Sequence, residues 1–334
     1  MFMMPPIVGK PMLLSPDFML SWPLDRGALG PSVMEPTANY VNDLHAEFGG
    51  CDIVLSSSGN YHMALHDLWF TYLDENAQRI GIKHWFYSTS PPVVISQLQN
   101  HGIQLGNIRV VSPPQVAVGP LTLMQDLTRL GFKDGNIEPI LKSRGNVLLV
   151  RRGNPKNIQS VWDLMKEGVR LVTPNPGTEP GTFKNFVSTL YNLACNDGAC
   201  SGGVTADQLF NAVFNEGMNA ASTINHHWFT GHRVMHREIP WAINADKADV
   251  AIIFYHLARY FKAIFPDIFD FLPLGGTMAC PDPLPGNAIE TLYATRIIGQ
   301  WNKVQLAARE CLMEALLSAK FDNTLAHYGL LRPE

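Results

Sequence analysis

One stretch near the middle of the chain constrains the fold more than any other. Two short runs rich in β-branched residues, 147–150 and 169–173, flank a segment with the periodicity of a helix. Asn157 or Ser160 is suited to cap the start of that helix, and Gly168 to end it. Because the connections are short, we expect a strand–helix–strand unit whose elements pack side by side in an α/β protein.

A turn rich in proline and glycine follows the second of these strands. It runs from Asn175 to Phe183, carries Thr178 and Thr182, and precedes an amphipathic segment that reaches Leu193. Backbone N–H groups and hydroxyls at the start of a helix favour a bound anion. The sequence therefore makes Thr178 and Thr182 candidate ligand-binding residues.

The order and spacing of these segments resemble the type II periplasmic solute-binding proteins, in particular their molybdate and sulfate branch. The strand leads into Gly153-Asn154-Pro155-Lys156-Asn157-Ile158, then into a leucine-containing helix, a second strand and the Thr-bearing loop. The resemblance implies an α/β fold of two lobes, each a mixed or parallel sheet flanked by helices, joined by two crossing segments at a hinge. An ordinary strand–helix–strand unit of another α/β protein is the alternative.

Two further segments carry the same resemblance. Ala248–Ala258 resembles an acidic, apolar strand of the family whose tyrosine hydroxyl reaches the oxyanion, which implies a ligand-binding role for Tyr255. Phe321–Pro333 resembles the family's closing helix and tail, with Leu330 where the family has phenylalanine. The implied division is an N-terminal extended arm at 1–48, lobe 1 at 49–147 and 276–334, and lobe 2 at 148–275.

Two turns rich in hydroxyl groups follow predicted strands in lobe 1. Ser57, Ser58 and Asn60 come after the strand at 51–55, and Ser88 and Thr89 come after the strand at 84–87. The carboxyl ends of parallel strands are where α/β sheets bind ligands, and the family uses such turns to face its ligand. We expect these five residues to bind the ligand, although helix capping alone accounts for one of the serines.

Residues 226–238 have the most unusual composition in the chain, with four histidines in eleven positions. Without a nearby cysteine or a pair of carboxylates a metal site is disfavoured, so we expect neither a metal nor a cofactor. Pro240 predicts a helix over Trp241–Lys247. Arg237 would then lie just before a helix N-terminus, where it could pair with an anionic ligand or with Glu238.

Size and charge exclude several classes of protein. The chain has 334 residues, 46% of them hydrophobic, which exceeds the usual limit of about 250–300 residues for one core. Its formal charge of −4 opposes nucleic-acid binding. No apolar run approaches the roughly 18 residues that a membrane span needs. Cys195 and Cys200 bracket a turn, and they are either a small disulfide or two separate thiols.

The start of the chain leaves the cellular location open. Met1–Pro6 has neither a basic region nor an uninterrupted apolar run, so it is not a secretory signal. The resemblance implies a periplasmic or other extracytoplasmic protein, and a cytoplasmic location is the alternative. Apolar residues of the arm, such as Phe18 and Trp22, are expected to pack on a lobe or to form a dimer with a second copy.

The function that follows from the resemblance is solute capture for an ABC-type importer, with a membrane permease as partner. A small anion, molybdate- or tungstate-like, would be held between two lobes by hinge closure. The bulky Trp85 and Tyr87 do not occur in the simplest oxyanion binders of the family, so a larger anion or an organic acid is an alternative ligand. The alternatives are an enzyme on the same scaffold, using Cys51 with His62 or His236, and a cytoplasmic sensor of a small molecule.

Overall fold

The structure, a computed structural model, describes residues 2–14, 46–89, 95–105, 108–197, 203–216, 224–232 and 234–334. The chain forms two compact units. Unit 1 comprises Met1–Leu14, Lys142–Glu290 and Leu325–Leu331, and unit 2 comprises Ser15–Leu141, Thr291–Thr324 and Arg332–Glu334. Both mix helices with a sheet, so the predicted two-lobed α/β class is confirmed.

Unit 1 is built on a six-stranded sheet in the order β1-β11-β10-β12-β9-β13. The strands are β1 (Lys10–Leu13), β9 (Asn146–Arg151), β10 (Leu171–Val172), β11 (Ile224–Thr230), β12 (Val250–Phe254) and β13 (Phe269–Pro273). The first four strands of that order run parallel, whereas β9 is antiparallel to both of its neighbours. β12 and the central residues 147–150 of β9 are apolar and buried, as expected of strands covered on both faces of a sheet.

The predicted strand–helix–strand unit is wrong in two respects. β9 and β10 are not adjacent, because β12 lies between them and pairs with β9 along five residues. Every residue of β12 is buried, so this central position hides the most apolar strand from water. In place of the expected α-helix there is a short 3-10 helix, η3 (Val161–Met165). A capping box between Ser160 and Asp163 lies at its start.

Unit 1 also contains helices. They are α4 (Pro180–Asp197), α5 (Ala206–Phe214), α6 (Met235–Asn244), α7 (Tyr255–Ile264) and the later part of α9 (Ala319–Tyr328). α6 corrects the prediction that Pro240 opens a helix, because the helix begins five residues earlier and Pro240 lies inside it. His236, Arg237 and Glu238 therefore belong to the first turn of α6 and do not precede it.

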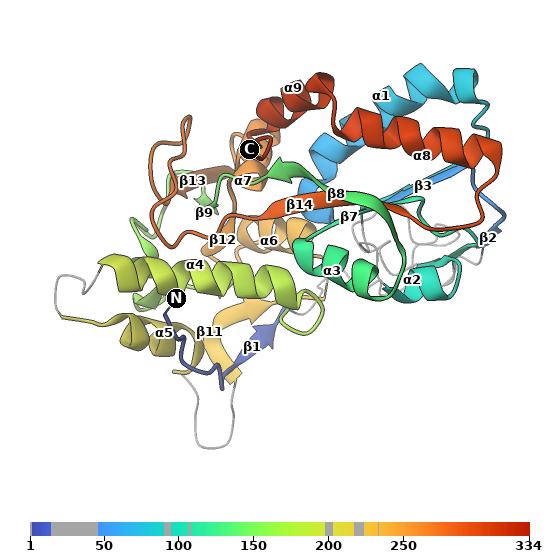
Figure 1. Cartoon of the computed structure of the whole chain (residues 1–334). Coiled ribbons are helices and arrows are strands. Elements are labelled where there is room, and N and C mark those ends of the chain that lie inside the picture. The colour runs from blue at the N-terminus through green and yellow to red at the C-terminus, as the bar shows by residue number, and fades with distance from the viewer. Residues whose placement is uncertain are drawn as a thin grey trace, which may run out of the picture. The chain divides into compact units, whose positions relative to one another are not determined.

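The described part of the N-terminal arm is not free of regular structure. β1 adds to the edge of the unit 1 sheet beside β11 (Figure 1). Ahead of it, the Asn215 side chain accepts from the N–H groups of Val8 and Gly9 and donates to the carbonyl of Pro6. These contacts hold this part of the arm on a lobe of its own chain, which is one of the two expected alternatives. Residues 15–45 of the arm, including Phe18 and Trp22, lie outside the described residues.

Unit 2 contains a five-stranded sheet in the order β4-β3-β7-β14-β8 and a three-stranded sheet in the order β2-β6-β5. The strands are β2 (Ala46–Phe48), β3 (Ile53–Ser56), β4 (Trp85–Ser88), β5 (Ile103–Leu105), β6 (Ile108–Val110), β7 (Val116–Gly119), β8 (Lys133–Lys142) and β14 (Thr291–Ile297). The helical segments are η2 (Gly59–Tyr61), α1 (His62–Ile80), α2 (Ile95–Gln99), α3 (Leu121–Arg129) and α8 (Lys303–Leu316). Figure 1 shows α8 beside α1, against which it packs.

Two segments of unit 2 that the sequence predicts as helix are strands. The sequence of residues 289–297 predicts a helix, but Thr291–Ile297 is β14, which pairs antiparallel with β7. Leu292 and Ala294 are buried there with half-buried residues between them, and this period of two fits a strand. The sequence also predicts a short helix at the end of the arm, over 38–48. Residues 46–48 are instead β2, which pairs with β6, while 38–45 lie outside the described residues.

The cysteines and the helix lengths bear on two further expectations. Cys195 is a free thiol, and Cys200, its predicted partner, lies outside the described residues. None of the helices in the described part of the chain combines the length and hydropathy needed to cross a bilayer.

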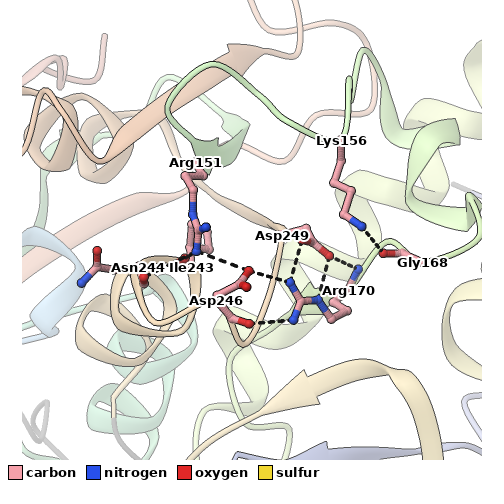
Figure 2. A network of polar contacts seen from close by, with 8 residues as sticks. All are labelled: Arg151, Lys156, Gly168, Arg170, Ile243, Asn244, Asp246 and Asp249. Atoms are coloured by element: carbon pink, nitrogen blue, oxygen red, sulfur yellow. Dashed lines mark hydrogen bonds and ion pairs between the residues drawn. The ribbon is translucent and has the colours of Figure 1, made fainter.

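An ion-pair network joins the amino-terminal ends of β10 and β12. Arg170, just before β10, makes a two-pronged contact with Asp249, just before β12, and also reaches Asp246 (Figure 2). Arg151 donates to the carbonyl of Ile243 at the end of α6, 2.9 Å away. Arg151 thus holds α6 at one edge of the sheet, opposite the edge where the parallel strands have their carboxyl ends.

Candidate functional site

The two hydroxyl-rich turns of unit 2 lie next to each other. β3 and β4 are parallel, and their last residues, Ser56 and Ser88, are in register. The backbone N–H of Ser57 donates to the carbonyl of Ser88 over 2.9 Å, which joins the two turns. The structure therefore brings Ser57, Ser58, Asn60, Ser88 and Thr89 to one edge of the sheet, at the carboxyl ends of two neighbouring strands.

The side chain of Ser57 is unusual in this group. The residue is fully buried, and its Oγ contacts no hydrogen-bonding partner among the described residues. Burying a hydroxyl without a partner costs roughly 1–3 kcal/mol, so such groups are rare and call for an explanation. Ser58 is half-buried and precedes η2 without capping it through its side chain, and Asn60 is buried within η2.

The corresponding edge of unit 1 collects three helix N-termini. β10, β11 and β12 are mutually parallel, and the helices that follow them are α4, α6 and α7. Each of these helices has ten residues or more and begins at the carboxyl end of the sheet. The backbone N–H groups and dipoles of all three ends make this edge favourable for negative charge.

Two loops at this edge are fixed to each other by hydrogen bonds. Asn175, in the loop after β10, donates from its side chain to the carbonyl of Gly231, after β11. The same side chain accepts from the N–H of Gly177. A Cβ at Gly231 would lie 2.1 Å from the carboxyl carbon of Glu238, so only glycine lets that buried carboxylate pack against the loop.

The four predicted ligand residues of unit 1 differ in their surroundings. Thr178 is exposed in the loop after β10, and Thr182 is half-buried in the first turn of α4. Arg237 is exposed in the first turn of α6. Tyr255 is buried at the start of α7, and its hydroxyl donates to the carbonyl of Met278 over 3.0 Å. The single donor of Tyr255 is therefore used within the fold.

Glu179 is a residue at this edge that the sequence analysis missed. Its Oε2 accepts the N–H of Met235, the first residue of α6, over 2.8 Å. Burial raises the pKa of the Glu179 carboxyl to about 7, and this hydrogen bond opposes the shift only in part. The sequence singled out this loop by the hydroxyl of Thr178. Nothing there pointed to Glu179, because the residue that it contacts lies 56 positions away in the sequence.

The enzyme alternative depends on the reactivity of Cys51 and on a histidine beside it. Cys51 is buried, and burial raises the pKa of its thiol, an effect to which the nearby Asp52 adds. A raised pKa disfavours the thiolate, which is the nucleophile. His62 lies with its Nδ1 2.8 Å from the carbonyl of Gly59, and His236 lies on α6 of unit 1.

The histidine-rich segment forms a strand and a helix start. His226 and His227 lie on β11 and are exposed, His232 is exposed in the loop, and His236 is half-buried on α6. Across the described ranges, no group of three histidine, cysteine or acidic side chains is placed to hold a metal ion.

Comparisons with known proteins agree with this architecture. Residues 101–331 match the model of the family described as bacterial extracellular solute-binding protein. The sulfate-binding protein of Escherichia coli (strain K12) is 32% identical over 115 residues, which cover 31% of this chain and 34% of that protein. The sulfate-binding protein of Salmonella typhimurium (strain LT2) matches to the same extent. The chain thus aligns with about a third of the length of these relatives.

Solved structures show the same fold at low sequence identity. The sulfate-binding protein SubI of Mycobacterium tuberculosis H37Rv superposes with a TM-score of 0.56 at 14% identity, over 87% of this chain and 88% of that one. The periplasmic molybdate-binding protein of Azotobacter vinelandii gives 0.55 at 14% identity, over 84% and 100%. The resemblance to the type II solute-binding proteins is confirmed. The chain belongs to the bacterial extracellular solute-binding protein family.

Proposed function

We propose that this solute-binding protein captures a small anion, with an oxyanion of the molybdate, tungstate or sulfate kind as the favoured ligand. The observation that carries the proposal is the meeting of three helix N-termini, α4, α6 and α7, at the carboxyl edge of the unit 1 sheet. Aligned N–H groups stabilise negative charge without a cationic partner. The names of the relatives, which bind sulfate or molybdate, support the same class of ligand.

Unit 2 would supply the second set of donors. The hydroxyls of Ser57, Ser58, Ser88 and Thr89 lie at the carboxyl ends of β3 and β4. An oxygen atom of the ligand would give the buried Oγ of Ser57 the partner that the described residues do not provide. From unit 1 the proposed contacts are the N–H groups of the helix ends with Thr178, Thr182 and Arg237.

In this proposal the anion lies between the two units and favours their closed arrangement, because it contacts both only when they are closed. The closed complex would then deliver the anion to the permease of an ABC-type importer outside the cytoplasm. Tyr255 contributes by holding Met278 through the hydrogen bond from its hydroxyl.

Thermal unfolding in the presence of molybdate, tungstate, sulfate, phosphate and small carboxylates tests the proposal. A ligand that binds only the folded state stabilises it by RT ln(1 + [L]/Kd), about 2.7 kcal/mol at a hundredfold excess over Kd. Stabilisation by a tetrahedral oxyanion is the expected result. If none of the anions raises the unfolding temperature, the proposal is wrong.

Ser57→Ala gives a sharper test because the two outcomes separate. The hydroxyl has no partner among the described residues, so its loss should leave the stability of the free protein unchanged or slightly higher. A hydrogen bond to a charged ligand contributes about 1.5–3 kcal/mol, so affinity should fall roughly tenfold to a hundredfold. Ser112→Ala is the matched control, at another buried serine of unit 2. Its Oγ accepts the N–H of Cys51 over 2.9 Å, so that variant should lose stability and keep affinity.

A further inference from the structure

The carboxylate of Glu179 occupies a position that an anionic ligand would otherwise use. Glu179 ends the loop between β10 and α4, and its Oε2 takes the N–H of Met235 at the start of α6. The backbone on both sides is fixed, because the Glu179 N–H donates to the carbonyl of Asn175 and the N–H of Phe183 donates to that of Glu179. The side chain thus stays at one of the three helix ends where the anion is proposed to bind.

The second carboxylate oxygen is available to a ligand. Within the part of the chain that the structure describes, Oε1 of Glu179 accepts no hydrogen bond, and the residue is half-buried. An ionised carboxylate offers only acceptors and repels an oxyanion, whereas a protonated one donates an O–H to it. Because burial brings the pKa of this carboxyl to about 7, both forms are populated near neutral pH.

The other charged and titratable groups near Glu179 come from two elements and a loop. They are Lys184 on α4, His232 in the loop after β11, and His236, Arg237 and Glu238 on α6. Arg233, in the same loop, lies outside the described residues. Desolvation and the Met235 N–H are the causes of the shift in the pKa of Glu179, so the carboxyl responds to its burial and not to one of these charges.

We propose that Glu179 couples anion binding to a proton and thereby determines which anions the site accepts. This inference rests on the proposed function and adds to it. A dianion without a proton of its own, such as sulfate or molybdate, binds when Glu179 is protonated and donates its O–H to a ligand oxygen. One proton enters from solvent with each such ligand. An anion that carries a donor, such as hydrogen phosphate, donates instead to the ionised carboxylate and needs no extra proton.

The pH dependence separates these two classes of ligand. Above pH 7, each further pH unit removes about nine-tenths of the protonated Glu179, so affinity for sulfate or molybdate should fall up to tenfold per unit. Below pH 6 the affinity should level off, because nearly all of the carboxyl is protonated. Affinity for hydrogen phosphate should not fall in this way between pH 7.5 and 9.

Isothermal titration calorimetry with the full chain tests the inference. Sulfate, molybdate and phosphate are titrated from pH 6 to 9 at constant ionic strength, each in two buffers with different ionisation enthalpies. The difference in heat between the buffers counts the protons taken up with the ligand. We expect close to one proton per sulfate or molybdate above pH 8, and close to none at pH 6.

Glu179→Gln isolates the residue responsible. The amide oxygen still accepts the Met235 N–H, and the amide NH₂ imitates the protonated carboxyl, so the variant should bind sulfate or molybdate equally well from pH 6 to 9 without proton uptake. Glu167→Gln, at an exposed glutamate of the same unit, should keep the wild-type pH profile. His236→Asn tests whether the neighbouring histidine causes the pH dependence of anion affinity. This variant should also keep the wild-type pH profile.

The outcomes distinguish this inference from the function on which it rests. If none of the anions binds at any pH, both are refuted. If sulfate or molybdate binds to the wild type with the same affinity from pH 6 to 9, or if Glu179→Gln keeps the wild-type slope, anion capture stands and proton coupling by Glu179 is refuted. A flat wild-type profile refutes the coupling even if the Gln variant does not fold.

Discussion

Replacing Arg170 by methionine should destabilise unit 1 strongly without changing the affinity for the anion. The guanidinium donates through Nε and Nη2 to the two oxygens of Asp249, each over 2.9 Å. It also donates to the carbonyl and the side chain of Asp246 (Figure 2). The hydrogen bond to Asp249 is the main cause that raises the pKa of Arg170, so the guanidinium keeps its charge at any physiological pH.

The magnitude follows from the burial of the two partners. The side chain of Asp249 is 8% exposed and that of Arg170 is 30% exposed. Removing one partner of a buried ion pair costs about 3–5 kcal/mol, because the other charge stays behind without compensation. Part of this cost is relieved by water near the exposed side of Arg170, so we expect about 3 kcal/mol for Arg170→Met.

Urea denaturation of the single and double variants measures this cost. Arg170→Met with Asp249→Leu should recover part of the loss, because no unpaired charge remains buried. Arg152→Met is the control, since Arg152 and its partner Asp267 are 58% and 85% exposed and such pairs contribute about 0–1 kcal/mol. Anion affinity should not change, because the network lies at the amino-terminal ends of the strands. A loss below about 1 kcal/mol for Arg170→Met would refute the argument.

Three further predictions concern stability. The Glu179 carboxyl has a pKa near 4.5 when unfolded and about 7 when folded, so its contribution is complete below pH 4.5 and lost as pH rises through 7. Relative to Glu179→Gln, the wild type should lose about 3 kcal/mol over that range in urea titrations, and parallel curves would contradict this. Leu149→Ala, in the buried centre of β9, should cost about 3 kcal/mol by thermal or urea unfolding, whereas Leu306→Ala, 41% exposed, should cost far less. Asn302→Ala should cost about 1 kcal/mol, because it removes the capping box at the start of α8; an unchanged midpoint would contradict that role.

Part of the candidate site could be predicted because its signals are local. Hydroxyl-rich turns after two apolar strands, at Ser57 and Ser88, depend only on neighbours in the chain, and the parallel register of β3 and β4 brings them together. The roles of Thr178, Thr182, Arg237 and Tyr255 stay predictions. Glu179 could not be found in this way, because its role depends on a contact with Met235 and on burial by elements distant in the sequence.

The wrong secondary-structure predictions have the same origin. Residues 289–297 are compatible with either a helix or a strand by local pattern, and pairing with β7 makes Thr291–Ile297 a strand. Proline is common as the first residue of a helix, but Pro240 lies inside α6. The helix begins at Met235, whose N–H donates to Glu179. In both cases a partner far away in the chain outweighs the local preference.

Local chemistry along the chain was enough to identify the apolar strands, the turns between them and the family resemblance, because periodicity and turn residues act over a few positions. The order of the strands, with β12 between β10 and β9, came only from tertiary packing, since burying the most apolar strand is a property of the whole sheet. The same holds for Ser57 and Glu179: the sequence supplies a hydroxyl and a carboxyl, and burial in the folded unit leaves one without a described partner and raises the pKa of the other.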